Sequence, residues 1–242
     1  MSSHPPDLPP HLRPFVLPHE AVEPVRSGGL DLYLPASTPA PAVLMVHGGP
    51  VPRHVEVRPP QWSTYRGYGA LLAQAGLVCG MFEHGFVDQE TLGAAQQNIR
   101  DAAATLRADP RVDPDRFGMW YFSAGGLFMG SVLADPAAWG VAAVAGTYAA
   151  PAAAGLDDPA LPPATVTAAL SDIPLLLVRP EHDFEWIVAG TTELLERCAS
   201  EHRAVDVIEV PGGHHGFETV DDTDEARDAI RRSVAWWAQT LR

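Results

Sequence analysis

A serine, an aspartate and a histidine, the three residue types of a nucleophilic catalytic triad, each follow an apolar segment in this chain. Ser123 comes directly after the run Phe117–Phe122 and before the small residues Ala124–Gly126, and Asp183 and His215 come after two later apolar runs. A serine hydroxyl is a poor nucleophile by itself, so it needs a base, an acid that orients the base and donors that stabilise an oxyanion. The three residues therefore predict nucleophilic chemistry at Ser123, provided that the fold brings them together.

The candidate base is one of two adjacent histidines, His214 and His215, which follow the apolar run Val205–Val210. Histidine suits this role because its ordinary pKa of about 6.5 lets it accept and return a proton near neutral pH. Side chains of adjacent residues point in different directions, so only one of the two should reach Ser123. We expect no metal here, because adjacent histidines rarely bind one ion without further ligands at ordered spacing.

Each candidate also has a simpler structural interpretation. Ser123 and Asp183 are both good N-cap residues for the helices expected after them. Glu181 is the alternative acid, because it lies closer than Asp183 to the end of the preceding apolar run. Two glycines, Gly48 and Gly49, follow an earlier apolar run and would also suit a tight turn.

The order of the predicted elements indicates an α/β fold. Apolar runs of strand length alternate with segments whose apolar residues recur at helical spacing. This alternation is typical of a mostly parallel central sheet with helices on both faces, in which ligands bind at the carboxyl ends of the strands. We expect strands at 30–34, 42–46, 77–82, 117–122, 141–144, 174–178 and 205–210, and helices at 65–75, 92–106, 127–134, 187–198 and 226–241.

Four segments carry a resemblance to a known family: His47–Pro50, Tyr121–Gly125, Arg179–Asp183 and His214–Phe217. In this order they resemble the oxyanion loop, the nucleophile elbow, the acid turn and the base loop of α/β-hydrolases. The resemblance is greatest to the compact dienelactone-hydrolase-like serine esterases, and it runs from about residue 30 to residue 242. The chain departs from the family at two points. Tyr121 occupies a position that is usually small, and dienelactone hydrolases carry cysteine where this chain has serine.

The resemblance implies a role for each member of the triad. Ser123 would be the nucleophile and Asp183 the acid that holds the base. His215 would be the base, because the family pattern most often reads His-x-Phe at this point, which selects His215 and Phe217. The chain order of nucleophile, acid and base is that of the α/β-hydrolases.

The resemblance also implies an oxyanion hole built from backbone N–H groups. One donor would be Ala124, the residue after the nucleophile, and the other would come from the loop that contains Gly48 and Gly49. We favour Gly49 over Gly48 as this second donor. His47 would anchor the loop, because it precedes the serine in the chain and no suitable acid follows it.

Loop residues near these motifs are candidates for substrate binding. Arg53 and Arg58 follow the glycine loop in a chain with 16 basic and 30 acidic residues, and either would bind a substrate carboxylate through a bidentate pair. Their simpler interpretation is that of solvated loop arginines. Trp62 and Trp186 would line the pocket or belong to the core. The proline-rich stretch 146–173 has room for a short helix at 164–170, so we expect an open site or one with a small cover, and no large cap domain.

Composition bounds the class of protein. The chain has 242 residues, of which 46% are hydrophobic and 19% charged, and we expect one domain at 25–242 behind a proline-rich arm at 1–24. No apolar run approaches the roughly 18 residues of a membrane span, and the first residues lack the layout of a signal peptide. We therefore expect a cytoplasmic protein with no membrane partner.

The net charge and the motifs of the chain limit which partners and cofactors we expect. The net charge of -14 disfavours nucleic acid as a partner. Cys79 and Cys198 lie on apolar faces and are expected to be buried thiols. The sequence has no phosphate loop, no dinucleotide fingerprint and no ordered metal-ligand spacing, so no cofactor is implied. It favours no particular oligomeric state.

The leading interpretation is a serine hydrolase that cleaves a small carboxylic ester or lactone. The same residues would also serve an acyltransferase or cyclase, in which an alcohol or amine captures the acyl group, or a peptidase. A third interpretation is a non-catalytic α/β-hydrolase scaffold that acts as a binding module, and Tyr121 at the elbow is its one support in the sequence.

Overall fold

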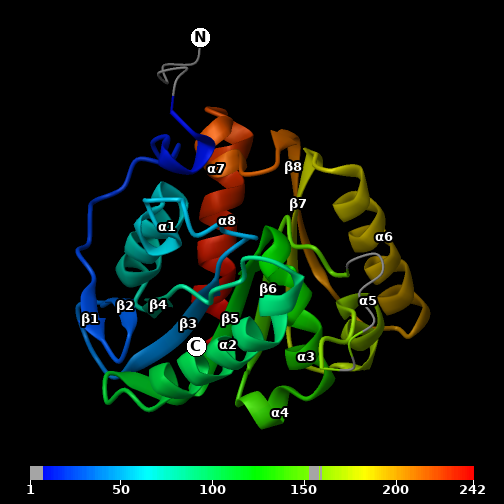
Figure 1. The fold of residues 1–242 in the computed structure, drawn as a ribbon, viewed down its shortest axis with the longest axis horizontal. Coiled ribbons are helices and arrows are strands. Elements are labelled where there is room, and N and C mark those ends of the chain that lie inside the picture. Colours follow the sequence, from blue (N-terminus) through cyan, green and yellow to red (C-terminus); the bar gives the residue numbers. More distant parts are fainter. Residues whose placement is uncertain (1–7, 153–157, 159) are drawn as a thin grey trace.

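The structure is a computed structural model that describes residues 8–152, 158 and 160–242. Residues 1–7 of the predicted arm and residues 153–157 and 159 of the stretch in which a small cover is predicted lie outside the described residues. Within the described residues the chain forms one eight-stranded sheet with helices on both faces (Figure 1). The α/β fold predicted from the alternating pattern is thus confirmed.

Six of the strands run parallel, and two antiparallel strands extend the sheet at one edge. The spatial order is β1-β2-β4-β3-β5-β6-β7-β8, in which β1 and β2 are antiparallel to their neighbours. The six parallel strands therefore all have their carboxyl ends at the same end of the sheet. The strands are β1 (Val25–Ser27), β2 (Leu30–Tyr33), β3 (Ala40–Val46), β4 (Val78–Met81), β5 (Val112–Phe122), β6 (Ala143–Thr147), β7 (Leu175–His182) and β8 (Asp206–His214).

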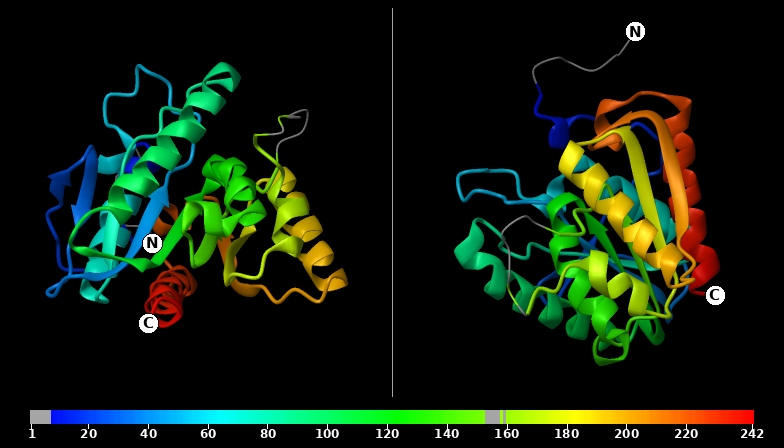
Figure 2. Two further views of the ribbon diagram at one scale, coloured as in Figure 1. Left: turned by 90° about the horizontal axis from the view of Figure 1, so that it is seen from below. Right: turned by 90° about the vertical axis from the view of Figure 1, so that its right-hand side faces the viewer.

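The helices form a layer on each face of the sheet. Two helices pack on one face, α1 (Ser63–Gln74) and α8 (Asp224–Thr240). Helix α8 lies below the sheet in the left view of Figure 2. The opposite face is covered by α2 (Leu92–Arg107), α3 (Met129–Ala134), α5 (Ala164–Thr167) and α6 (Glu185–Ser200). Two further helices are short, α4 (Pro136–Trp139) and α7 (Phe217–Val220).

Burial on both faces explains the sequence pattern of the central strands. The inner part of β3, residues 42–46, is fully buried because helices cover both of its faces. Gly118 in β5 lies beneath Trp237 of α8, where an added Cβ atom would come within 2.2 Å of the indole ring. The core is therefore two apolar layers, one on each side of the sheet.

The described part of the predicted arm lies against the domain. Val16 is buried, its N–H donates to the Glu218 carbonyl oxygen (2.8 Å), and its own carbonyl accepts from Arg227 Nε (3.2 Å). The ring of Phe15 packs edge-on against Tyr68 of α1, with centroids 5.3 Å apart. These contacts join the N-terminal segment to α1, α7 and α8.

The stretch between β6 and β7 contains the short helix that was predicted at 164–170. It forms as α5 followed by a 3-10 turn, η5 (Ala168–Leu170). Among the described residues, no helix is long and apolar enough to cross a lipid bilayer.

Candidate active site

Ser123 stands at a sharp corner between β5 and the 3-10 helix η4 (Ser123–Phe128). Its φ of 49° lies in the left-handed region, which costs a non-glycine residue on the order of 1 kcal/mol or more. The corner is so tight that a Cβ atom added at Gly125 would come within 2.4 Å of the His47 carbonyl oxygen. A strained serine held between a strand and a helix is the geometry of a nucleophile elbow.

Tyr121 does not prevent this corner from forming. Its side chain is fully buried in the core layer that α2 and α3 cover, two residues before Ser123. In the neighbouring strand β6 the residue paired with Tyr121 is Gly146. The departure from the usual small residue is therefore accommodated within the core.

The structure brings Ser123, His215 and Asp183 into one hydrogen-bonded chain. Ser123 Oγ lies 2.8 Å from His215 Nε2, and His215 Nδ1 lies 2.7 Å from Asp183 Oδ1. Because an ionised carboxylate only accepts hydrogen bonds, His215 donates through Nδ1 and presents Nε2 to the serine hydroxyl. This is the tautomer in which a histidine can remove a proton from serine.

The candidate acid is buried and the candidate base is partly open. The Asp183 side chain is 2% exposed and also accepts the Phe184 N–H (2.7 Å), whereas the His215 side chain is 23% exposed. The His215 ring contacts two aromatic rings, Tyr148 at 4.5 Å and Phe184 at 4.7 Å between centroids. Its position is thus set by these two rings and by Asp183 at Nδ1.

The two alternatives left open by the sequence lie elsewhere. Glu181 is exposed and accepts the Gly212 N–H (2.8 Å), so its carboxylate is not the partner of the base. His214 is exposed, and its Nδ1 lies 2.9 Å from Asp221 Oδ1. Because β8 is extended as far as His214, consecutive side chains point to opposite sides, and only His215 reaches Ser123.

The glycine loop after β3 lies against Ser123. An added Cβ atom at Gly48 would come within 2.8 Å of Ser123 Cβ. The Gly48 N–H donates to the Tyr65 hydroxyl (3.0 Å), so the prediction that this N–H could serve the oxyanion hole is corrected. Ala124 is the second residue of η4. The first N–H groups of a helix have no acceptor within that helix, so the Ala124 N–H is not used by η4. Gly49 and Ala124 remain the predicted donors.

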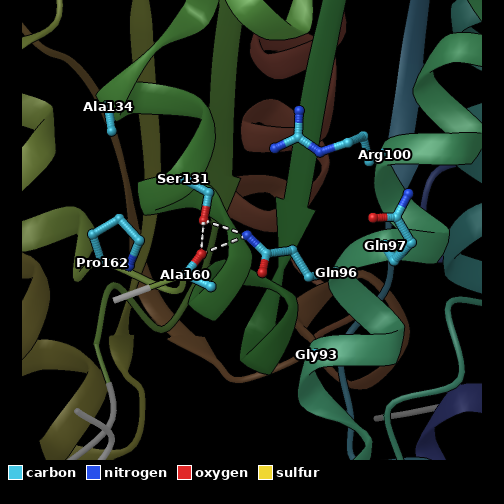
Figure 3. A pocket seen from close by; sticks show the side chains of 8 residues that line it. All are labelled: Gly93, Gln96, Gln97, Arg100, Ser131, Ala134, Ala160 and Pro162. Atoms are coloured by element: carbon cyan, nitrogen blue, oxygen red, sulfur yellow. Dashed lines mark hydrogen bonds between the residues drawn. The ribbon is translucent and has the colours of Figure 1, made fainter. Parts of the chain in front are cut away.

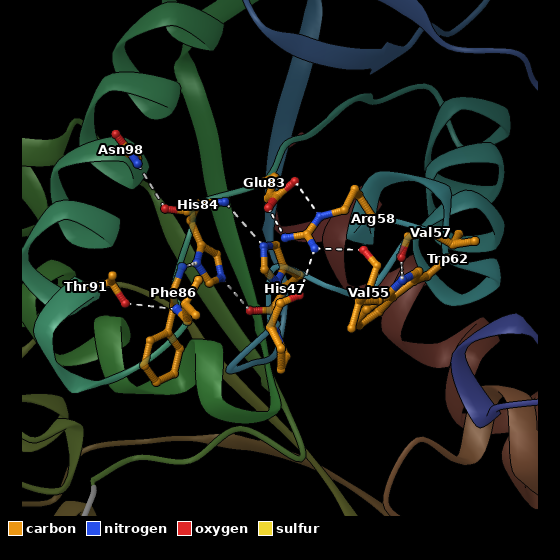
Figure 4. A network of polar contacts seen from close by, with 12 residues as sticks. His47, Val55, Val57, Arg58, Trp62, Glu83, His84, Phe86, Thr91 and Asn98 are labelled. Carbon is orange, nitrogen blue, oxygen red and sulfur yellow. Dashed lines mark hydrogen bonds and ion pairs between the residues drawn. The ribbon is translucent and has the colours of Figure 1, made fainter.

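Two buried histidines anchor the glycine loop, as Figure 4 shows. The rings of His47 and His84 stack with centroids 3.6 Å apart. His47 Nε2 accepts the His84 N–H (3.3 Å), and His84 Nδ1 accepts the Phe86 N–H (3.2 Å). Each ring therefore carries its proton on the other nitrogen, where His47 donates to the Gly48 carbonyl and His84 donates to the His47 carbonyl.

Both rings of this pair are held neutral. Burial lowers the pKa of His84 to about 4, and burial together with the neighbouring His84 lowers the pKa of His47 well below its ordinary value. A proton added to either ring would convert an acceptor nitrogen into a donor that faces an N–H group. The loop geometry thus depends on two uncharged imidazoles.

Arg58 is not available to a substrate, which corrects its predicted role. Its guanidinium forms a bidentate ion pair with Glu83 and donates to the carbonyl oxygens of Pro52 and Val55, both at 3.0 Å (Figure 4). Arg58 therefore joins the loop after β3 to Glu83, which lies two residues after the end of β4. Arg53 is exposed and borders a hollow of about 300 Å³ beside this loop, and its role in substrate binding stays a prediction.

The two predicted tryptophans differ in position. Trp62 donates through Nε1 to the Val57 carbonyl (2.9 Å) and stacks on Tyr65, with centroids 6.0 Å apart. It also packs against the core layer that α1 covers, which agrees with the second of its two interpretations, that of a core residue. Trp186 is 52% exposed in the first turn of α6. The aromatic residue that touches the base is Phe184, which the sequence analysis did not single out.

A larger hollow lies away from Ser123, between α2 and the residues before α5. Its volume is about 370 Å³, and Gln96, Arg100 and Ser131 line it (Figure 3). Gln96 Nε2 and Ser131 Oγ both donate to the Ala160 carbonyl oxygen, so these polar groups are already paired. In the part of the chain that the structure describes, no group of three or more acidic, histidine or cysteine side chains is arranged to bind a metal ion.

Glu218 is the buried charged residue that sequence reasoning missed. It lies three positions after His215, is fully buried, and accepts hydrogen bonds from the hydroxyls of Tyr68 (3.0 Å) and Tyr148 (2.9 Å). Its partners are 150 and 70 positions away in the chain, so no local pattern could have revealed them.

Comparison with known proteins places this geometry in a fold. No protein-family model and no curated protein matches the sequence. Carboxyl esterase 2 from the mycorrhizal fungus Tuber melanosporum is similar in structure, with 19% identity, 88% of this chain and 81% of that chain covered, and a TM-score of 0.71. EstE1, a thermophilic carboxylesterase cloned from a metagenomic library, has 18% identity, 96% and 92% coverage and a TM-score of 0.69. A truncated carbohydrate esterase from gut microbiota has 16% identity, 92% and 96% coverage and a TM-score of 0.70. The chain has the α/β-hydrolase fold.

Proposed function

We propose that this protein is a serine hydrolase that cleaves a small carboxylic ester or lactone through an acyl-enzyme on Ser123. The observation that carries the proposal is the chain of two hydrogen bonds from Ser123 through His215 to the buried Asp183. The fold supports it, because the similar structures reported above are described as esterases. The motifs that resemble dienelactone-hydrolase-like esterases belong to the same proposal, with serine as the nucleophile in place of cysteine.

In the first half of the reaction the serine oxygen attacks the ester carbonyl carbon. His215 Nε2 takes the serine proton, and the imidazolium that forms is stabilised by Asp183. Negative charge develops on the carbonyl oxygen, where the N–H groups of Gly49 and Ala124 would donate to it. The C–O bond to the leaving alcohol then breaks, and His215 returns its proton to the departing oxygen. For a lactone this alcohol stays attached to the acyl group.

In the second half water replaces the alcohol. His215 removes a proton from water as the water oxygen attacks the acyl carbon. The bond between that carbon and Ser123 Oγ breaks, and the proton passes from His215 to the serine oxygen. The products are a carboxylic acid and the free enzyme, so no external cofactor is required for the cycle.

The substrate class follows from the openness of the site and from the charge of the chain. The short α5 and η5 segment leaves no described helix that would cover Ser123 with a large cap, which supports a small or aryl ester. The net charge of -14 argues against nucleic acid or an anionic membrane as the partner, so the substrate that we propose is a small molecule. The location that we propose is the cytoplasm.

The experiment that tests the proposal compares hydrolysis of short and medium p-nitrophenyl esters by the wild type, Ser123→Ala and the exposed control Ser37→Ala. We expect Ser123→Ala to lose at least about 10⁴-fold in kcat while it keeps its fold, and Ser37→Ala to match the wild type. A fluorophosphonate should label the wild type and leave Ser123→Ala unlabelled. A wild type that neither hydrolyses any ester nor takes the label would overturn the proposal in favour of a binding scaffold.

A further inference from the structure

Two aromatic rings contact the His215 ring, one from a buried residue and one from an exposed residue. Tyr148 is 6% exposed, whereas Phe184 is 54% exposed, and both rings contact the His215 ring. An exposed side chain exchanges rotamers freely, so Phe184 alone cannot fix the ring. The orientation of His215 on its buried side therefore depends on where Tyr148 is held.

Tyr148 is held in an unfavourable backbone conformation. It follows β6 directly and has a φ of 37°, in the left-handed region that bulky side chains rarely adopt. Two contacts at opposite ends of the residue maintain this state. Its N–H donates to the Val178 carbonyl oxygen (2.9 Å), and its hydroxyl donates to Glu218 Oε2 (2.9 Å). The strained backbone belongs to the residue whose ring touches the base, which points to a function.

Glu218 connects this tyrosine to three other parts of the molecule. Its second oxygen accepts from the Tyr68 hydroxyl of α1 (3.0 Å), and its backbone carbonyl accepts from Val16 of the N-terminal segment (2.8 Å). It belongs to α7, which follows the base after Gly216 and lies near α1 and β8 (Figure 1). Glu218 thus fixes both the chain that carries His215 and the ring that His215 packs on.

A carboxylate is a costly residue to bury for simple packing. In the described residues no lysine or arginine forms an ion pair with Glu218, and its side-chain partners are the two tyrosine hydroxyls. A glutamine or methionine would fill similar space without the desolvation of a charge. The two hydroxyls converge on separate oxygens, which is an arrangement that a carboxylate satisfies best because it only accepts.

We propose that Glu218 is a positioning residue for the base. Glu218 acts on His215 through Tyr148, and its hydrogen bond with Tyr68 holds Glu218 in place against α1. This inference rests on the proposed function, because it assigns Glu218 a part in the reaction at Ser123. Glu218 does not touch the substrate. It fixes the Tyr148 ring, on which the His215 ring must stay packed as the proton passes between Ser123, the leaving group and water.

Kinetics of matched variants test the proposal. We expect Glu218→Gln and Tyr148→Phe each to lower kcat by about tenfold to a hundredfold with KM changed less than about twofold, because misplacement of a reacting group acts on the chemical step. Tyr33→Phe is the control, since Tyr33 is a buried tyrosine whose hydroxyl has no partner within the described residues. It should keep the wild-type kcat.

A spectroscopic readout separates positioning from a merely structural role and does not need a substrate. The proton between His215 Nδ1 and Asp183 should give a far-downfield proton NMR signal, assigned by its loss in His215→Ala. We expect this signal to shift or broaden in Glu218→Gln and Tyr148→Phe and to stay unchanged in Tyr33→Phe.

The outcomes are distinguishable. A Glu218→Gln protein that keeps both the wild-type kcat and the wild-type signal overturns the inference, whatever its melting temperature. If Glu218→Gln does not fold, Tyr148→Phe decides, because it removes one hydroxyl and leaves the carboxylate in place. If the wild type hydrolyses no ester, the proposed function fails, while the NMR comparison still decides whether Glu218 positions His215.

Discussion

Asp183 and Glu181 are two carboxylates that lie two positions apart at the end of β7, and the structure gives them different tasks. Asp183 is buried against His215 Nδ1, whereas Glu181 accepts a backbone N–H at the surface. We expect Asp183→Asn to lower kcat by about 10³-fold to 10⁴-fold, because an amide stabilises the wrong histidine tautomer and not the imidazolium. Glu181→Gln is the matched control and should stay within about twofold of the wild type.

Steady-state ester hydrolysis with circular dichroism of each variant checks this expectation. If Glu181→Gln lost activity to the same extent as Asp183→Asn, the assignment of the acid would be wrong.

The roles of single residues could be predicted from the sequence where they depend on neighbouring residues in the chain. Ser123, Asp183 and His215 follow apolar strands in the printed order, and strand ends converge in a parallel sheet, so their proximity followed from the pattern. The pairing of Arg58 with Glu83 did not follow from the pattern, because Glu83 lies 25 positions away in the chain. A side chain whose role depends on one distant partner leaves no trace in the neighbouring sequence.

At the scale of elements, the site depends on how closely η4 approaches the end of β3. Gly125 makes this approach possible, since an added Cβ atom would meet the backbone oxygens of His47 at 2.4 Å and Val46 at 2.8 Å. We expect Gly125→Ala to move the elbow away from the glycine loop and to lower kcat/KM by at least about a hundredfold, because a shift of about 1 Å suffices for such a loss.

Gly93 provides the matched glycine. It is exposed in the first turn of α2, and an added Cβ atom there would have no neighbour within 4 Å. Gly93→Ala should keep full activity and raise the free energy of unfolding by about 0.5 kcal/mol through better helix propensity. Urea denaturation and ester hydrolysis of both variants check the pair, and equal activity in the two would contradict the role given to Gly125.

Elements were predicted where periodicity is strong and missed where they are short. The buried strands and the amphipathic α2, α6 and α8 were found, because each repeats its apolar pattern over several turns or residues. β1 spans three residues and α4 and α7 span four, which is too short for a period to show. α7 holds Glu218, so the missed helix and the missed residue have one cause.

At the scale of the whole molecule, two buried groups give opposite pH dependences of stability. Burial lowers the pKa of His84 to about 4, so between about pH 4 and 6.5 the unfolded chain binds more protons, and stability falls as the pH falls. Burial raises the pKa of Glu218 to about 7, so between about pH 4.5 and 7 the folded chain binds more protons, and stability falls as the pH rises. In the range that they share, the two effects offset each other.

Glu218→Gln should expose this compensation. Removing the carboxyl removes its pH dependence, so the stability of the wild type relative to Glu218→Gln should decrease by about 3 kcal/mol between about pH 4 and pH 8. Urea denaturation of both proteins across this range measures the difference. Two parallel curves of unfolding free energy against pH would show that Glu218 titrates in the folded protein as it does in the unfolded chain.

The contacts of Val16 have a consequence for how the protein is made. Arg227 and Val16 are hydrogen-bonded across 211 positions, and Val16 also binds the backbone of Glu218, three positions after the base. Contacts of such long range form late, because a large loop must close before they are gained. Arg227 leaves the ribosome 211 residues after Val16, so these bonds to the segment that follows His215 form only after both residues have emerged.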